Sequence, residues 1–406
     1  MHRYRLRPVE GHRPIVGRWP SLVSLERGGM MGVPIIFDKP FKTYDEQIKH
    51  LRDDYGLEIT DEELARYVLC TFSYYDIING YQECMMENGK FKSGISMMYL
   101  YIFHHFDKAF QNVIFKNILV VETSFKTKLA YILSERYGVS MYDYLNKANF
   151  KPQYKRKIVF SKVKRNIMDE ITFLDRKTNK IIYCKQPTKH YYEKHHHIPA
   201  WILMKNISFD NAINLYSLLK QEDKEKVTLE MVCGDINISD KISFLMSSLN
   251  LIRKFRNVIA HNLKFVTYKQ EKSKLPRQTT IKLINEPLVT NGIIEFDNLY
   301  GCILAIYVLL NDKQEKIIFI KELLEVLLGG PLGLKKLSNL NHKTVIDYMK
   351  ITNLGEDLFL RLTTLMVLDF KKAGMTEENS EACRQMYMVL ESLKMYSNTQ
   401  IVSDES

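Results

Sequence analysis

The stretch LNLIRKFRNVIAHNLKF, Leu249–Phe265, is predicted to form a helix with one apolar face. Its apolar residues recur at helical spacing, at Leu249, Ile252, Phe255 and Ile259. That spacing is typical of a helix packed against a core. Its second half carries a group of polar residues that such a packing role does not require: Arg256, Asn257 and His261.

The polar group is expected to share one region of the helix surface. Asn257 and His261 lie four residues apart and so share a face, which Arg253 extends by one turn. Arg256 lies one residue round, with a side chain long enough to reach an anion near His261. The Arg-x-x-x-x-His spacing also occurs at Arg7–His12, where a proline and a glycine exclude a regular helix. The alternative is a purely structural role, in which Arg256 lies at the surface and the polar atoms of His261 find hydrogen-bond partners inside a helix–helix contact.

The composition of the whole chain limits the class of protein in which this helix lies. The chain has 406 residues, 46% of them hydrophobic, which is enough for two or three domains' worth of core. It carries 58 basic and 47 acidic residues, a formal net charge of +11, which suits a polyanionic partner such as RNA, DNA or an anionic membrane. The six cysteines are scattered without a C-x-x-C pair, which predicts reduced thiols in a cytoplasmic protein. The longest apolar run, Cys302–Leu310, is short of the ~20 residues of a membrane span, so none is expected.

The chain is predicted to be all-α. Capping boxes begin helices at Thr43 and Thr60, and a long helix is expected to break near His104–Asp107 and end at Gly138. Further helical patterns follow Ser208, Ser239 and Asp297, and then cover Lys316–Leu328, Lys343–Thr352 and Asp357–Lys372. Thr279–Asn285 alone has the pattern of a strand.

The predicted organisation has four parts. Residues 1–30 are rich in Arg, Pro and Gly and are expected to be a disordered extension, or to lie upstream of a true start at Met30 or Met31. Residues 39–270 are expected to form a helical domain with a basic insert near 150–200. A C-terminal helical region, 279–396, and a flexible tail, 397–406, follow.

Two segments interrupt the helices. Basic residues alternate with Tyr154 and Phe160 in the first, which favours single-stranded nucleic acid, although a solvated basic helix face would have the same pattern. The RNA-binding residues expected there are Lys151, Lys155, Arg156, Lys157, Lys162, Lys164 and Arg165. The second, Lys189–Trp201, has four histidines without a carboxylate or cysteine at ligand spacing. A polar loop is expected there rather than a metal site, and no cofactor is expected.

Five segments in order resemble the Abi-like abortive-infection family (the AbiD and AbiF proteins), which belongs to the HEPN group of helical nucleases. They are Lys39–Ile59, Phe72–Gln82, Ile102–Ala130, Ile198–Leu219 and Leu251–Phe265, the last with the R-N-x-x-A-H signature. The chain departs from the family at four positions. Lys126 replaces an arginine that follows the acid, here Glu122; Asp210 replaces a glycine; and Phe110 and Gln111 replace a leucine and an arginine.

The resemblance implies a HEPN-type helical bundle with additional C-terminal helices, and RNA cleavage without a metal by attack of a ribose 2′-OH on the adjacent phosphate. His261 would transfer protons, Arg256 would hold the phosphate, and Asn257 would orient the histidine or the RNA. Glu122, Lys126 and Arg253 would support them.

The resemblance also implies a setting for the activity. Composite HEPN sites imply a symmetric homodimer. A toxin in phage defence would need an antitoxin, and a small RNA bound at Lys151–Arg165 and Lys269–Arg277 is one form it could take. Two alternatives stay open: an RNA-binding module that does not cleave, and a helical scaffold that senses a phage protein through the C-terminal third.

Overall fold

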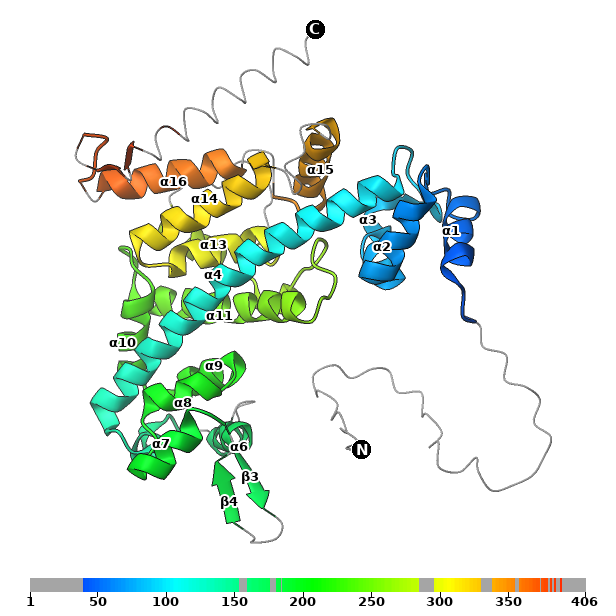
Figure 1. Ribbon diagram of the computed structural model, residues 1–406. Coiled ribbons are helices and arrows are strands. Elements are labelled where there is room, and N and C mark those ends of the chain that lie inside the picture. Colours follow the sequence, from blue (N-terminus) through cyan, green and yellow to red (C-terminus); the bar gives the residue numbers. More distant parts are fainter. Residues whose placement is uncertain are drawn as a thin grey trace, which may run out of the picture. The chain divides into compact units, whose positions relative to one another are not determined.

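Helices make up nearly all of the regular secondary structure in this protein, for which we describe a computed structural model (Figure 1). The structure describes residues 39–152, 159–175, 180–183, 185–284, 296–329, 338–354 and 358–372, and part of 374–388. The predicted extension, 1–30, and the predicted tail, 397–406, lie outside these ranges. The chain divides into two units after Thr43, and every contact discussed below lies within Tyr44–Ser406. The all-α prediction is confirmed.

The elements follow one another with short connections. The first group is α1 (Tyr44–Asp53), α2 (Glu62–Tyr74), the π-helical turn η1 (Tyr75–Asn79), α3 (Gln82–Met85) and the hairpin β1 (Met86–Glu87)–β2 (Lys90–Phe91). The second is α4 (Met97–Tyr137), α5 (Met141–Tyr144), η2 (Lys147–Asn149), α6 (Phe160–Ile171), β3 (Thr172–Asp175), β4 (Lys180–Tyr183), α7 (Thr188–His195), α8 (Ala200–Asn206), α9 (Phe209–Leu218), α10 (Gln221–Met231) and α11 (Ile238–Ala260). The last is η3 (Glu271–Ser273), α12 (Arg277–Ile284), α13 (Leu299–Leu309), α14 (Lys313–Gly329), α15 (Ser338–Ile351) and α16 (Leu358–Lys372).

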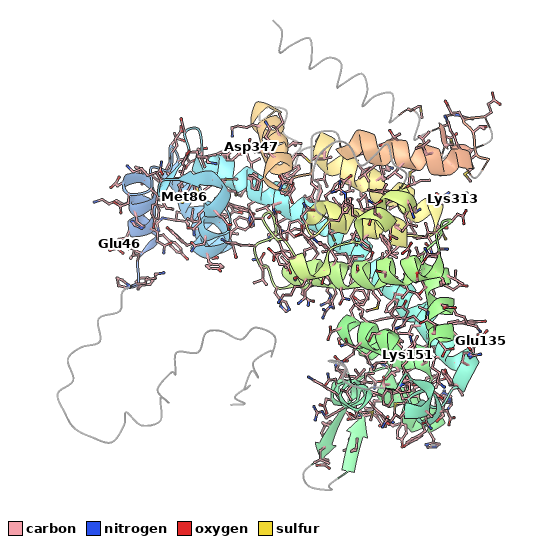
Figure 2. The ribbon with its side chains drawn as sticks, turned by 180° about the vertical axis from the view of Figure 1, so that it is seen from behind. Glu46, Met86, Glu135, Lys151, Lys313 and Asp347 are labelled. Atoms are coloured by element: carbon pink, nitrogen blue, oxygen red, sulfur yellow. The ribbon has the colours of Figure 1, made fainter. Side chains whose placement is uncertain are left out.

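The long helix α4 is the centre of the fold (Figure 1). It packs against α2 and α5, against α8 to α11, and against α13 to α15. Ser96 caps its start by accepting from the Tyr99 N–H, and Gly138, at φ 87°, ends it as predicted. Figure 2 shows the helices around Met86 and those around Glu135 at opposite ends of α4. One helix therefore ties the N-terminal and C-terminal helices to a single core.

The predicted break in α4 near His104–Asp107 is wrong, because the helix is continuous there. Both residues are buried, and both find polar partners without leaving the helix. Asp107 accepts hydrogen bonds from the Tyr81 hydroxyl (2.9 Å), the Gln111 amide (2.8 Å) and the Tyr348 hydroxyl (3.1 Å). His104 Nδ1 lies 2.9 Å from the same Tyr81 hydroxyl. Because these hydrogen bonds satisfy the buried polar side chains, the helix does not have to break to expose them to water.

Three other local predictions are corrected. The predicted strand Thr279–Asn285 is wrong over its described part, because Thr279–Ile284 lies in α12, which packs against α11. The Thr280 hydroxyl donates to the Pro276 carbonyl (2.8 Å), and Asn285 lies outside the described residues. The packing of this segment against α11 therefore outweighs its preference for the strand conformation. Helix α2 is capped by Asp61, which accepts from the Leu64 N–H, and not by Thr60. The histidine-rich segment is not all loop, since its first half forms α7.

Strands occur where helix or loop was expected. β1 pairs with β2, and β3 pairs with β4, each as an antiparallel hairpin. The β3–β4 hairpin follows α6 directly and exposes Phe173, Leu174 and Ile181. Within the described parts of the chain, every helix is too short or too polar to cross a bilayer.

The C-terminal helices share the core built on α4. α13 is buried along its whole length and packs against α11 and α4, while α14 and α15 pack against α4 and α16 against α14. The bond from Tyr348 to Asp107 and another from the Tyr99 hydroxyl to Asp347 join α15 to α4. The C-terminal third thus stabilises the same helix that carries Glu122 and Lys126.

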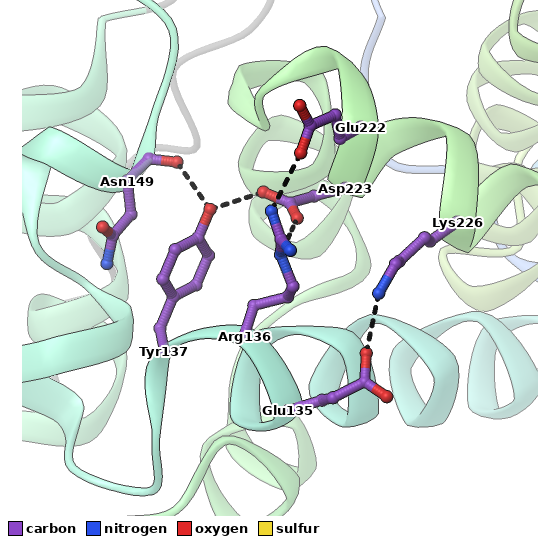
Figure 3. Close-up of polar contacts among 7 residues, drawn as sticks. All are labelled: Glu135, Arg136, Tyr137, Asn149, Glu222, Asp223 and Lys226. Atoms are coloured by element: carbon purple, nitrogen blue, oxygen red, sulfur yellow. Dashed lines mark hydrogen bonds and ion pairs between the residues drawn. The ribbon is translucent and has the colours of Figure 1, made fainter.

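A polar junction holds the far end of α4 to α10 (Figure 3). The fully buried carboxylate of Asp223 accepts from Arg136 Nε (2.9 Å) and from the Tyr137 hydroxyl. Arg136 also pairs with Glu222 (3.0 Å), and Lys226 pairs with Glu135 (3.0 Å). Because α10 packs against α11, this junction sets where α11 runs relative to α4.

Candidate functional site

The polar residues of the opening stretch lie together at the C-terminal end of α11. Asn237 caps the start of this helix by accepting from the Asp240 N–H (2.8 Å). Its apolar face buries Leu249, Ile252 and Phe255, as the spacing predicts. Arg256 and Asn257 are half-buried, whereas His261 is exposed. A helix whose apolar side faces the core therefore presents these polar groups at its accessible end.

The helix ends in a defined turn that positions His261. The last helical residue is Ala260, and the His261 N–H still donates to the Asn257 carbonyl (3.1 Å). Asn262 follows in the left-handed region at φ 51°, its N–H donating to Ile259 O (3.1 Å), and the Leu263 N–H donates to Val258 O (2.9 Å). This pair of bonds is the Schellman arrangement that closes many helices. His261 is thus the C-cap residue of α11, and its N–H keeps the helical hydrogen bond to Asn257.

Glu122 and Lys126 on α4 back the arginine of α11. Lys126 Nζ lies 2.6 Å from Glu122 Oε1 and also donates to the Ile207 carbonyl (2.8 Å). Arg256 Nε lies 3.9 Å from Glu122 Oε2, and Arg256 Nη1 donates to Asn257 Oδ1 (3.4 Å). Glu122 is buried, and Lys126 and Arg256 place two positive charges near its carboxylate. The lysine that departs from the family pattern keeps an ion pair with the acid.

This arrangement leaves the arginine able to bind an anion. Neither Arg256 Nε nor Glu122 Oε2 has a hydrogen-bond partner among the described residues, and the 3.9 Å between them is too long for one. The Arg256 side chain is about one-third exposed, at 35%. Its guanidinium is held in place by charge while its outer part faces solvent. That is the position from which an arginine holds a phosphate.

Arg253 is engaged in a different contact. It forms an ion pair with Asp210 at the start of α9, and its Nη2 donates to Asn250 Oδ1 (3.4 Å). Asp210 stands where the family resemblance places a glycine, so this departure supplies the partner of Arg253. The geometry makes Arg253 a link between α9 and α11, one turn before Asn257.

The structure adds two residues to the site that the sequence interpretation missed. The Lys108 ammonium on α4 donates to Asn262 Oδ1 and to Gln111 Oε1 (3.3 Å). Asn262 directly follows His261, so Lys108 brings a positive charge to the exposed end of α11. Lys108 lies in the F-D-K-A-F-Q stretch of the family resemblance, which was the available signal. Its contact across 154 positions of sequence is not visible in any local pattern.

The basic segment is only partly described, since Lys155, Arg156 and Lys157 lie outside the described residues. Lys162 and Arg165 are exposed on α6, while Lys164 donates to the Leu145 carbonyl (3.1 Å). Lys151, labelled in Figure 2, donates to Gln221 (2.9 Å).

The aromatic part of the expected pattern does not face solvent. Phe160 is buried against Phe150, with 4.5 Å between ring centroids, and Tyr154 lies outside the described residues. The described part of α6 is therefore a solvated basic face above an apolar one.

A second basic stretch lies closer to α11. Lys269, Lys272 and Lys274 are exposed in the loop that includes η3, and Arg277 is exposed at the start of α12. η3 packs against α11. Tyr268 anchors this loop on Phe255, with 5.1 Å between ring centroids. In the part of the chain that the structure describes, no three His, Cys, Asp or Glu side chains are grouped as metal ligands.

Comparison with known proteins bears on this same part of the chain. Residues 67–266 match the family model described as Abi-like protein. This part of the chain belongs to the Abi-like family. The Abi-like region begins within α2 and ends just after α11, so it contains Glu122, Lys126, Arg253, Arg256 and His261. No curated protein and no solved structure matches the chain.

Proposed function

We propose that the Abi-like region is an endoribonuclease that acts in abortive infection and cuts RNA by transphosphorylation. Membership of the Abi-like family supports the defence role. The observation that carries the chemistry is the grouping of Arg256, Asn257 and His261 at the exposed end of α11, with Glu122 and Lys126 behind the arginine.

Each residue has a role that its chemistry suits. A ribose 2′-OH attacks the adjacent phosphorus, its proton is removed, and the 5′ oxygen leaves with a proton, giving a 2′,3′-cyclic phosphate and a 5′-OH. His261 carries an imidazole whose ring nitrogens can accept or donate a proton, so it can serve in either proton transfer. Arg256 offsets the charge that builds on the phosphate oxygens. Asn257, expected to orient the histidine or the RNA, has an Oδ1 that accepts from Arg256 Nη1, so we propose that it orients the arginine instead.

The active form is proposed to be a homodimer. Two copies of α11 facing each other across a two-fold axis would bring two sets of arginine and histidine to one RNA strand. His261 lies at an accessible end of α11, which such an arrangement requires. Sedimentation of a fully active monomer would contradict this part of the proposal.

A control element is proposed as well, because an unrestrained ribonuclease would damage its own cell. A small RNA bound at Lys162 and Arg165 on α6, and at Lys269–Arg277 beside α11, would serve as antitoxin. The second of these stretches packs against the helix that carries the site, so RNA bound there would lie near His261. Replacing its four basic residues by glutamine should weaken RNA binding and flatten its salt dependence.

The decisive experiment is induced expression of the wild-type chain beside His261→Ala and Arg256→Ala, with total RNA mapped for new 5′-OH ends. His190→Ala is the matched control, because His190 is exposed on α7 outside the site. Growth arrest and new ends in wild type and His190→Ala, absent in both site variants, would support the nuclease. Growth arrest that survives both site substitutions would favour a phage-sensing scaffold. RNA binding without new ends in any variant would favour a non-cleaving module.

A further inference from the structure

Four aromatic rings meet on one side of α4, near its N-terminal end. Tyr67 and Phe72 come from α2, and Tyr101 and His105 come from α4. Ring centroids are 4.6 Å apart for Tyr101 and His105, 5.5 Å for Phe72 and His105, and 6.0 Å for Phe72 and Tyr101. Tyr67 lies 6.4 Å from Tyr101. We call these residues the ring cluster.

The ring cluster is at the surface, unlike most aromatic residues of this fold. Tyr67 is 50% exposed, and the other three members are half-buried. The large rings of α4 that serve the core, such as Phe103, Phe106 and Phe110, are fully buried instead. A group of rings in mutual contact that still reaches solvent is suited to stacking against a flat ligand.

The backbone beside the ring cluster is strained. Ser73 has φ 63° and ψ 151°, a conformation that side chains rarely adopt, and it interrupts α2 just after Phe72. The π-helical turn η1 follows at once. Strain of this kind and π turns are both concentrated at functional sites. The strain sets the direction in which the chain turns after Phe72, and so where the Phe72 ring is held.

Residues on one stripe of α4 link the ring cluster to the candidate site on α11. Tyr101, His105 and Lys108 are spaced i, i+4 and i+7, so they lie on one stripe of the helix, about 10 Å from first to last. Lys108 at the end of this stripe donates to Asn262, the neighbour of His261. In Figure 1, α2 and the C-terminal end of α11 lie on the same side of α4. The stripe therefore connects the rings to the exposed end of α11.

The polar groups on this stripe fit a nucleic acid strand. Lys108 contacts two neutral amide oxygens, which leave its positive charge available to a phosphate. His105 Nε2 is buried and has no hydrogen-bond partner among the described residues. Because this nitrogen is covered, His105 contributes the face of its ring to the ring cluster, and burial lowers the pKa of His105, which favours the neutral imidazole.

We propose that the ring cluster is a stacking surface for bases of the single-stranded RNA whose cleavage site lies at His261, with Lys108 contacting the phosphate between them. This inference rests on the proposed ribonuclease function and adds the path of its substrate. The strand runs along α4 from the rings to the end of α11. Its bases stack without sequence preference, because every base offers a flat face.

The test measures binding of a fluorescein-labelled, unstructured 20-nucleotide RNA to the full chain carrying His261→Ala, so that cleavage does not interfere. Tyr67→Ala or Tyr101→Ala is added to this background. Tyr131→Ala is the matched control, since Tyr131 is 65% exposed on the same helix but about 45 Å from Tyr101 along its axis. Tyr67→Phe keeps the ring and tests whether a loss comes from stacking. Circular dichroism checks that each variant is folded.

Each cluster variant should weaken binding by roughly 5- to 100-fold, with the salt dependence unchanged. Tyr131→Ala and Tyr67→Phe should bind like the background, and Lys108→Gln should reduce the slope of log Kd against log salt by about one. Photo-crosslinking of a 4-thiouridine RNA should label the peptide that contains Tyr67 or Phe72.

Two results would overturn the inference. One is equal affinity of the background, Tyr67→Ala and Tyr101→Ala. The other is conversion of the cluster variants from dimer to monomer in sedimentation, which would make the rings a contact between copies of the chain. The proposed function fails separately: ring-dependent binding by a wild-type chain that makes no new 5′-OH ends would retain the stacking surface and discard the nuclease.

Discussion

Glu122 on α4 and Arg256 on α11 face each other with 3.9 Å between Oε2 and Nε, while the other Glu122 oxygen lies 2.6 Å from Lys126 Nζ. The carboxylate that orients the arginine is therefore itself held by a second cation from its own helix. α4 acts as a fixed support, and α11 presents the arginine to solvent. Removal of Lys126 would therefore leave the buried Glu122 with only the more distant Arg256.

Lys126→Met should destabilise the protein strongly, because it leaves the buried Glu122 with only the more distant Arg256. We expect the free energy of unfolding in urea to fall by about 3–5 kcal/mol. Lys126→Arg should remain close to wild type, since it keeps the charge. Lys116→Met, which removes a cation paired with Glu322 at an exposed position, should cost less than about 1 kcal/mol. A Lys126→Met protein with an unchanged urea midpoint would contradict the assigned role.

Asp223→Ala should destabilise more than Glu222→Ala, although both carboxylates bind Arg136. Asp223 is fully buried and also accepts from Tyr137, whereas the Glu222 side chain is 79% exposed. We expect a loss of about 3–5 kcal/mol for Asp223→Ala and a much smaller change for Glu222→Ala, measured by urea unfolding. Equal losses for the two variants would show that the burial of Asp223 does not determine how much its carboxylate stabilises the protein.

His104 should make the protein less stable in acid. Burial lowers its pKa to about 4, with Lys108 and His105 adding to the effect. Below pH 6.5 the unfolded chain binds a proton that the folded chain does not, so stability falls as the pH drops from about 6.5 toward about 4. Between pH 7.5 and 5.0 this contribution amounts to roughly 2 kcal/mol.

The measurement compares urea unfolding of wild type and His104→Gln at those two pH values. Wild type should lose roughly 2 kcal/mol more than the variant, because the contributions of other titrating groups are common to both. His190→Gln, at an exposed position, should follow wild type. An identical pH dependence for wild type and His104→Gln would show that His104 is not held neutral.

Asn262→Val should disturb the placement of His261, whereas Asn262→Gly should not. Position 262 has φ 51°, which glycine adopts freely and a β-branched residue adopts at a cost of roughly 1–2 kcal/mol. On the proposed function, RNA cleavage should fall by roughly 10- to 100-fold in the valine variant. Asn353→Val is the matched control, because Asn353 ends α15 in the same conformation, at φ 54°, outside the site. Equal cleavage by Asn262→Val and wild type would contradict the positioning role.

Much of the fold is readable from local patterns. The apolar spacing along α11 predicts which face is buried, and Gly138 ends α4 where its conformational freedom suggests. Predictions failed where contacts between residues distant in the sequence changed which local conformation is the most stable. The predicted break near His104 vanished because Tyr81 and Tyr348, distant in sequence, satisfy the polar side chains. Thr279–Ile284, predicted as part of a strand, lies in α12 because this helix packs against α11.

Periodicity and composition within a few helical turns were enough to predict the class of fold, the helix that carries the polar group and the residue types available there. The packing of the helices was needed to see that Lys126 and Arg256 both lie near Glu122, that Asp210 pairs with Arg253, and that Lys108 contacts Asn262. Three of these contacts join residues that are 43 to 154 positions apart in the sequence. The fourth, between Lys126 and Glu122, lies within α4, and helix packing brings Arg256 to the same carboxylate. Distances of that kind depend on how α4, α9 and α11 pack, which no local pattern encodes.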